Sequence, residues 1–192
     1  MRVAFTLIGG KHWLGGTNYL LNLISALHEA ASPIHPVVFT GRAVDDSQLK
    51  PMYEYLREPP VRSELWDSNW KRRFRTLDSL VLQRDSMVEN LFRSRGIDVV
   101  FQHSAWYGFR FSLPTIAWIA DFQHRRLPQM FTKSNFWKRE LGYKALSYSA
   151  TTIMVSSESA KKDCLEYYPA SAEKIEVLPF AVRDVGIPGS YR

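Results

Sequence analysis

Cysteine is almost absent from this sequence, because Cys164 is the only one among 192 residues. One thiol excludes an intrachain disulfide and a zinc site built from several cysteines, and it is typical of a protein in the reducing cytosol. Long apolar runs are also missing, since Gly9, Gly10 and Lys11 end the first one. That run is too short for a signal sequence or a membrane-spanning helix. We therefore expect a cytoplasmic protein that at most makes a peripheral contact at the inner face of a membrane.

A dinucleotide-binding fingerprint is missing too. Residues 9–16 (GGKHWLGG) lack the G-x-G-x-x-G spacing, and the next predicted strand runs into Thr40, Gly41 and Arg42 without an acidic residue at its end. This disfavours an NAD-dependent dehydrogenase. We also find no internal repeat and no low-complexity segment.

The composition is that of an ordinary soluble domain, with 45% hydrophobic and 23% charged residues. The length allows one generous domain or two small ones. The formal net charge of +6 suits acidic partners such as phosphorylated sugars, nucleic acid or anionic lipid, and it does not choose among them.

Short apolar runs alternate along the chain with segments of helical periodicity. Runs typical of buried strands cover 2–8, 36–40, 61–66, 97–102, 115–120, 151–155 and 174–178. Helical segments are expected at 17–27, 46–57, 66–81, 85–95, 133–149 and 157–168, and the one at 46–57 is expected to be interrupted near Pro51. In the helix at 133–149 we expect Phe136, Trp137, Leu141 and Ala145 on one apolar side. The alternation predicts an α/β fold with a doubly wound, mostly parallel sheet and helices on both faces.

The first candidate site follows the apolar run at 115–120. Asp121 comes directly after this run, His124 follows three residues later, and Pro128 prevents a simple helical continuation. Because the carboxyl ends of parallel strands face the ligand crevice, both side chains are candidates for an acid/base or substrate-orienting pair. A polar strand-end loop with a capping aspartate explains the same residues, so both interpretations stay open.

A second candidate site lies at the start of the first helix. Gly15, Gly16, Thr17 and Asn18 stand where bare backbone N–H groups can approach an anion at a helix N-terminus. A tight turn that merely needs its glycines is the alternative.

Two further strand ends carry polar residues. His103 follows the run at 97–102, where ligands bind in such sheets, although a purely structural histidine is the alternative. Ser156, Ser157 and Glu158 follow the run at 151–155, with Ser157 as the expected N-cap of the next helix. This helix start either binds an anion or does nothing beyond capping.

The segment 66–81 combines tryptophan with basic residues. Its apolar stripe and its basic side suit a helix that lies on an anionic membrane surface. The ordinary alternative is a buried helix face with a solvated basic side. Nucleic-acid binding through residues 71–75 is less favoured, because it requires Trp70 and Phe74 to be exposed for stacking.

Four segments in order resemble one known family. They are residues 13–23 (WLGGTNYLLNL), 118–131 (WIADFQHRRLPQMF), 155–163 (VSSESAKKD) and 174–180 (KIEVLPF). Together they resemble the N-terminal domain of GT-B glycosyltransferases of the family 4, or group 1, type. Residues 40–95 carry no such resemblance.

The resemblance implies one half of an enzyme that transfers a hexose from a nucleotide-sugar to a hydroxyl of a glycan or lipid-linked acceptor. Residues 1–183 would be the Rossmann-like acceptor domain, residues 184–192 would begin the interdomain linker, and the C-terminal nucleotide-sugar domain would be missing. This family acts with retention and without a metal. We therefore expect no metal and no cofactor beyond the donor substrate, and an isolated domain without activity.

The resemblance also implies roles for the candidate residues. Gly15 and Gly16 would approach the donor diphosphate, and Asp121 with His124 would orient acceptor or sugar. The serines and glutamate at 156–158 would line the interdomain cleft. Many members carry a histidine directly before this aspartate, where the present sequence has Ala120. The alternative function is a non-catalytic Rossmann-like module that partners a separate transferase.

Overall fold

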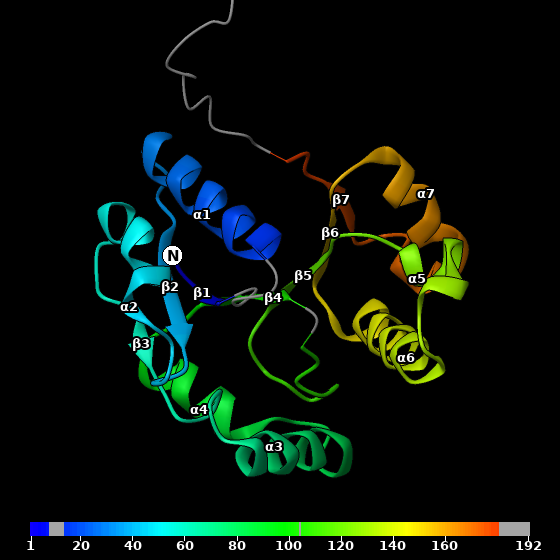
Figure 1. The fold of residues 1–192 in the computed structure, drawn as a ribbon, viewed down its shortest axis with the longest axis horizontal. Helices are drawn as coiled ribbons and strands as arrows, with labels where there is room; N and C mark the ends of the chain where they lie inside the picture. The colour runs from blue at the N-terminus through cyan, green and yellow to red at the C-terminus, as the bar shows by residue number, and fades with distance from the viewer. Residues whose placement is uncertain (8–13, 104, 181–192) are drawn as a thin grey trace, which may run out of the picture.

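The computed structural model describes residues 1–7, 14–103 and 105–180. They form a seven-stranded, wholly parallel sheet in the order β3-β2-β1-β4-β5-β6-β7, with helices on both faces (Figure 1). The predicted Rossmann-like α/β class is therefore confirmed. The predicted linker at 184–192 and the loop at 9–13 lie outside the described residues.

The element bounds follow the predicted alternation closely. The strands are β1 (Arg2–Thr6), β2 (His35–Thr40), β3 (Val61–Arg62), β4 (Val99–His103), β5 (Thr115–Ile119), β6 (Thr152–Val155) and β7 (Ile175–Val177). The α-helices are α1 (Leu14–Glu29), α2 (Asp46–Leu49), α3 (Asn69–Val81), α4 (Ser86–Ser94), α5 (Gln123–Arg126), α6 (Lys133–Ser149) and α7 (Glu158–Tyr167). Short 3-10 helices are η1 (Lys50–Tyr55), η2 (Pro128–Met130) and η3 (Pro169–Ser171).

One predicted break in a helix is confirmed, and one predicted strand is shorter than expected. The helix at 46–57 is interrupted near Pro51, as predicted, and it divides into α2 and η1 because Pro51 has no N–H to continue the α-helical bonding. The strand expected at 61–66 ends after Arg62, and Leu65 instead packs into the core. No helix in the described part of the chain is long and apolar enough to cross a membrane.

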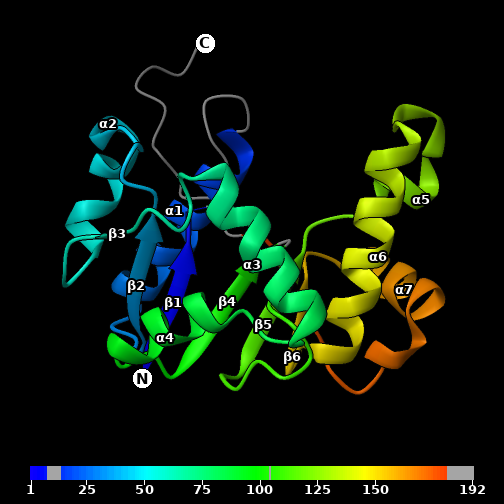
Figure 2. The ribbon, with the colours of Figure 1, turned by 90° about the horizontal axis from the view of Figure 1, so that it is seen from below.

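The sheet is covered on both faces, which explains why its strands read as continuous apolar runs. On one face Val3 and Phe5 of β1 share a core cluster with Leu20 and Ile24 of α1. On the other face Ala4, the intervening residue, belongs to a cluster with residues of α4. A further cluster joins β5 and β6 to α6 and α7. Figure 2 shows the N-terminal ends of α1 and α6 at the edge to which the strands point.

Helix α6 does not bury the face that its sequence suggests. Trp137 and Leu141 are 57% and 62% exposed, whereas Glu140, Tyr143 and Leu146 are buried. Trp137 and Leu141, which the sequence places on the apolar side of this helix, therefore face solvent. The helix turns Glu140 inward because that carboxylate finds hydrogen-bond donors on α5 and at the end of α7.

The loop between β4 and β5 packs tightly against the connection between α3 and α4. Gly108 has a φ of +99°, and a Cβ at this position would lie 2.2 Å from the backbone carbonyl of Gln83. The backbone N–H of Arg110 donates to the same carbonyl oxygen over 2.7 Å. This close approach is possible only because residue 108 is a glycine and has no side chain.

We expect Gly108→Ala to lower the free energy of unfolding by about 2–4 kcal/mol, because the strained φ and the backbone clash each cost about 1–3 kcal/mol. Urea denaturation of wild type and variant measures this difference. Gly142→Ala is the matched control, since a Cβ there meets nothing within 4 Å and α-helical alanine is favoured by about 0.5–1 kcal/mol. Equal stability of the two variants would contradict the close approach.

Candidate functional site

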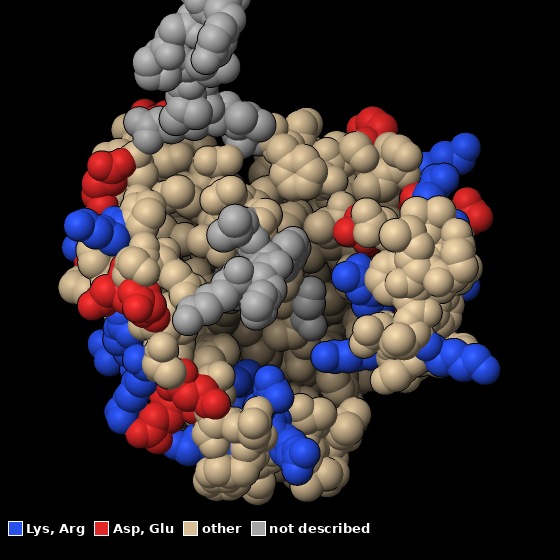
Figure 3. Space-filling view, in the orientation of Figure 1, with Lys and Arg blue, Asp and Glu red and all other residues tan. Residues whose placement is uncertain are grey.

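A cavity of about 500 Å³ lies at the carboxyl-terminal edge of the sheet, beyond β4 and β5. It is lined by His103, Trp118, Ala120, Asp121, Phe131, Asn135, Lys138, Arg139, Gly142 and Tyr143. Figure 3 looks onto this edge and shows lysine and arginine side chains on both sides of a central hollow. The site thus combines aromatic walls with a carboxylate and two cationic side chains.

The polar wall of the cavity comes from one face of α6. Asn135, Lys138, Arg139 and Gly142 stand at positions i, i+3, i+4 and i+7, which is one side of an α-helix. The side chain of Thr132 caps the helix by accepting a bond of 3.2 Å from the N–H of Asn135. None of these four residues was predicted from the sequence as a site residue, although their helical spacing was a visible signal.

Asp121 reaches the cavity directly after β5. Its Oδ1 accepts a bond of 3.0 Å from the backbone N–H of Gln123, and Nη1 of Arg139 lies 3.4 Å from the same oxygen. Asp121 therefore caps the loop, as one of the two interpretations predicted. Because both contacts involve Oδ1, Oδ2 can accept a hydrogen bond from a ligand. The ion pair itself contributes little stability, since both side chains are about 40% exposed.

His103 lines the same cavity from the end of β4. Burial, reinforced by the nearby Arg139 charge, lowers its pKa to about 4. The imidazole is therefore neutral at pH 7 and offers a hydrogen bond rather than a positive charge. Its ring centroid lies 5.7 Å from that of Trp118, which stacks in turn on Tyr19 of α1 at 4.0 Å.

His124 lies outside the cavity. Its side chain is completely buried, with Nε2 3.4 Å from both the Oε2 of Glu140 and the hydroxyl of Tyr168. The expectation of a solvent-facing histidine at the cleft edge is wrong, because α6 and the end of α7 enclose the ring. Burial lowers the pKa of His124 despite the neighbouring Glu140 carboxylate, so the neutral imidazole is favoured. A direct catalytic role is not supported by this position.

The contacts of His124 indicate a positioning role instead. Its ring lies 6.5 Å from Phe131 and 5.3 Å from Tyr143, and both of these residues line the cavity. His124 thus packs behind the aromatic part of the cavity wall and can support its position.

The two arginines that follow His124 bind acidic residues of neighbouring helices. Arg125 forms a two-pronged pair with Glu140 of α6, with Nε 2.7 Å from Oε2. Arg126 does the same with Asp163 of α7, with Nε 2.7 Å from Oδ2. Together the two pairs dock α5 onto both helices, and Tyr168 donates a further bond of 2.8 Å to Glu140.

The remaining predicted residues do not line this cavity. Gly15, Gly16, Thr17 and Asn18 form the beginning of α1, which starts at Leu14 rather than near Thr17. Gly16 is buried, and Gly15 and Asn18 are exposed.

The residues before α7 have local roles that the structure displays. The Oγ of Ser156 donates to the carbonyl of Ala120 over 3.2 Å and so ties β6 to the loop that carries Asp121. Ser157 is the predicted N-cap, since its Oγ accepts a bond of 3.1 Å from the N–H of Ala160. Glu158 is exposed in the first turn of α7. Among the predicted residues, the structure therefore brings together His103 and Asp121.

The comparisons with known proteins identify the fold. No protein-family model and no curated protein sequence match this chain. The solved structure of S. aureus MnaA with UDP aligns with a TM-score of 0.55 and 15% identity, covering 92% of this chain and 43% of that one. A Listeria monocytogenes protein assigned as a UDP-N-acetylglucosamine 2-epimerase aligns with a TM-score of 0.51 and 11% identity, covering 86% and 41%.

The described chain therefore spans less than half the length of both neighbours. At these identities the likeness concerns the fold and not a shared activity. The chain therefore has the Rossmann-like fold of a GT-B-type domain.

Proposed function

We propose that this chain is the acceptor-binding half of a retaining, metal-independent glycosyltransferase that moves a hexose from a nucleotide-sugar to a hydroxyl of a glycan or lipid-linked acceptor. The observation that carries the proposal is the cavity at the strand ends, which is lined by the carboxylate of Asp121 and the cationic side chains of Lys138 and Arg139. The GT-B-type fold adds support, as does the UDP in the MnaA complex.

The chemistry of the cavity suits a sugar that carries a phosphate. A carboxylate oxygen accepts hydrogen bonds from sugar hydroxyls, and Lys138 and Arg139 attract phosphate oxygens. Trp118 and Tyr143 supply an apolar surface for a sugar ring. Neutral His103 adds one hydrogen bond. Held together, these groups would orient an acceptor hydroxyl, and orientation is a large part of catalysis in a two-substrate reaction.

The donor would bind between this domain and a second one. The coverage of 43% and 41% of the neighbouring chains leaves room for such a second half. In this proposal the N-terminal ends of α1 and α7, with Gly15, Gly16 and Ser157, face the donor diphosphate, because helix N-termini favour anions. His124 acts behind the cavity wall by positioning Tyr143.

A second candidate is epimerisation of the nucleotide-sugar, which the name of the Listeria neighbour favours. The two reactions differ in their need for an acceptor. An epimerase changes the configuration of the sugar when the nucleotide-sugar is the only substrate, whereas a transferase releases nucleotide only when an acceptor hydroxyl is present. Proton NMR of UDP-N-acetylglucosamine with the two-domain protein, with and without acceptor, separates them.

Ligand binding tests the cavity in the isolated chain. We expect hexose phosphates to bind more tightly than the matching free hexoses, and Lys138→Gln to weaken the phosphate binding about tenfold, as expected for one charged hydrogen bond. Gly142→Leu is expected to abolish binding by filling open space. Isothermal titration calorimetry measures these affinities.

Lys162→Gln is the matched control, because Lys162 is an exposed lysine of α7 that does not line the cavity. Unchanged affinity in both Lys138→Gln and Gly142→Leu would contradict the proposed site. An equal loss in Lys162→Gln would show binding by overall charge rather than by this cavity.

A further inference from the structure

Helix α3 presents its apolar side to solvent. Trp70, Phe74, Leu77 and Val81 are spaced by four, three and four residues, so they form one stripe. Their exposed fractions are 65%, 49%, 56% and 68%. In Figure 1 the helix lies at the lower edge of the molecule, below α4, and in Figure 2 it lies in front of the sheet. The ordinary interpretation of a buried apolar helix face is therefore wrong for α3.

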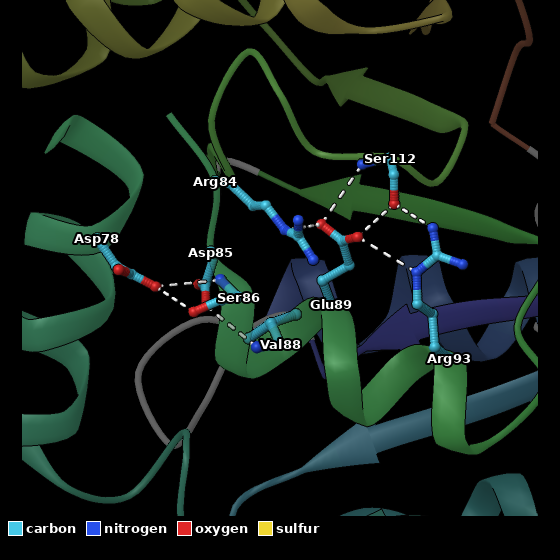
Figure 4. A network of polar contacts seen from close by, with 8 residues as sticks. All are labelled: Asp78, Arg84, Asp85, Ser86, Val88, Glu89, Arg93 and Ser112. Carbon is cyan, nitrogen blue, oxygen red and sulfur yellow. Dashed lines mark hydrogen bonds and ion pairs between the residues drawn. The ribbon is translucent and has the colours of Figure 1, made fainter. Parts of the chain in front are cut away.

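The polar side of α3 is turned inward, where it is bound to α4. Asp78 is buried and its Oδ2 accepts a bond of 3.2 Å from the N–H of Ser86 (Figure 4). Arg75 donates to Oδ2 of buried Asp85 over 2.8 Å and to the carbonyl of Leu65 over 3.0 Å. Turning the apolar stripe inward would break these bonds and leave Asp85 unpaired in the interior.

Helix α4 is itself firmly held at this position. The carboxylate of buried Glu89 lies 2.9 Å from Nε of Arg84 and 3.2 Å from Nε of Arg93, and it also accepts from Ser112 (Figure 4). These contacts join the α3–α4 connection, α4 and the loop before β5. The orientation of α3 is therefore a property of the packed fold rather than of a loose surface helix.

Within α3 itself, the exposed charges are all positive. The only acidic residue within α3 is Asp78, which is buried. Arg72 and Arg73 are exposed on the same helix. Lys71 is engaged by Glu64 at 2.5 Å. The solvent-facing part of α3 thus combines a wide apolar stripe with cationic side chains and has no carboxylate of its own.

We propose that this face of α3 docks onto an anionic lipid surface. The apolar stripe would enter the boundary between head groups and acyl chains, while Arg72 and Arg73 would contact lipid phosphates. A second copy of the chain is a poorer occupant, because a two-fold contact brings each patch against a patch of the same charge. Nucleic acid is a poorer occupant too, because the aliphatic Leu77 and Val81 offer no ring for a base to stack on.

Cosedimentation of the chain with vesicles tests the proposal. We expect binding to vesicles of phosphatidylcholine with about one-third phosphatidylglycerol at about 50 mM salt, weak binding to pure phosphatidylcholine, and release at about 500 mM salt. Trp70→Ser with Leu77→Ser is expected to reduce the partition coefficient at least about tenfold, because both apolar contacts are lost. Arg72→Gln with Arg73→Gln is expected to weaken binding to the anionic vesicles alone.

Trp137→Ser with Leu141→Ser is the matched control pair, since these α6 residues have the same chemistry and are 57% and 62% exposed. Thermal melting checks that each variant is folded. The proposal is overturned by absence of binding to anionic vesicles at low salt, or by an equal loss in the α6 pair. Tighter, competing binding of oligothymidylate, or a dimer that the α3 pair dissociates, would assign the face to the other occupants.

Discussion

Asp121→Ala is expected to lower turnover of the two-domain glycosyltransferase that we propose by ~10²–10⁴-fold, the usual effect of removing a positioned acid/base or orienting group. The expectation rests on the place of Asp121 in the cavity and on its contact of 3.4 Å with Arg139. Its carboxylate is partly exposed, and Asp121 belongs to none of the three core clusters described above. The variant is therefore expected to unfold at nearly the wild-type temperature. Steady-state kinetics and thermal melting on one preparation measure both quantities.

The control for Asp121 is Asp67→Ala. Asp67 also accepts bonds from loop backbone, from the N–H groups of Arg42 at 2.6 Å and Ala43 at 3.2 Å, and it does not line the cavity. Its loss is expected to cost about 1 kcal/mol of stability and to leave turnover intact. The same pattern in Asp121→Ala would reduce Asp121 to a loop cap and defeat its proposed role.

The largest effect on stability is expected from Glu140→Leu, which should lower the free energy of unfolding by about 2–4 kcal/mol. Glu140 is buried and holds Arg125, Tyr168 and His124 together. Without it, the Tyr168 hydroxyl and the His124 ring lose their acceptor inside the protein. Arg125 can turn to water, because its side chain is 36% exposed, and this keeps the cost below that of a fully enclosed pair.

Urea denaturation measures the effect, with Glu166→Leu as the control because Glu166 is an exposed glutamate of α7. The predictions for Glu140 and Asp121 also separate a structural role from a functional one. Glu140→Leu should damage stability and move the cavity wall, whereas Asp121→Ala should damage turnover alone. A fully stable Glu140→Leu variant would contradict the network.

The pH dependence of stability gives a further readout for Glu140. Burial by itself would raise the pKa of this carboxyl, but hydrogen bonds from Arg125 and Tyr168 outweigh it and hold the pKa below its ordinary value of 4.5. Because the folded-state pKa is the lower one, the contribution of Glu140 is complete above pH 4.5 and is lost as the pH falls through the folded value. The stability difference between wild type and Glu140→Leu should therefore shrink below pH 4.5.

The candidate site was only partly predictable from the sequence. His103 and Asp121 were predictable because the residues after parallel strands must lie at the carboxyl-terminal edge of the sheet. The burial of His124 was not, since the partners that enclose it, Glu140 and Tyr168, lie 16 and 44 residues further along the chain. The cavity face of α6 was readable in its helical spacing but was hidden beside the more apolar side with Trp137.

The sequence by itself determined the order of strands and helices and the parallel α/β fold, because local apolar periodicity and strand-end polarity suffice for these features. Only the tertiary structure decided which sides of α3 and α6 meet the core. Periodicity shows that a helix has two sides, but the choice depends on partners far along the chain, such as Asp85 for Arg75 and Arg125 for Glu140. Where such a partner satisfies a buried charge, the polar side turns inward, and the apolar side of α3 remains in solvent.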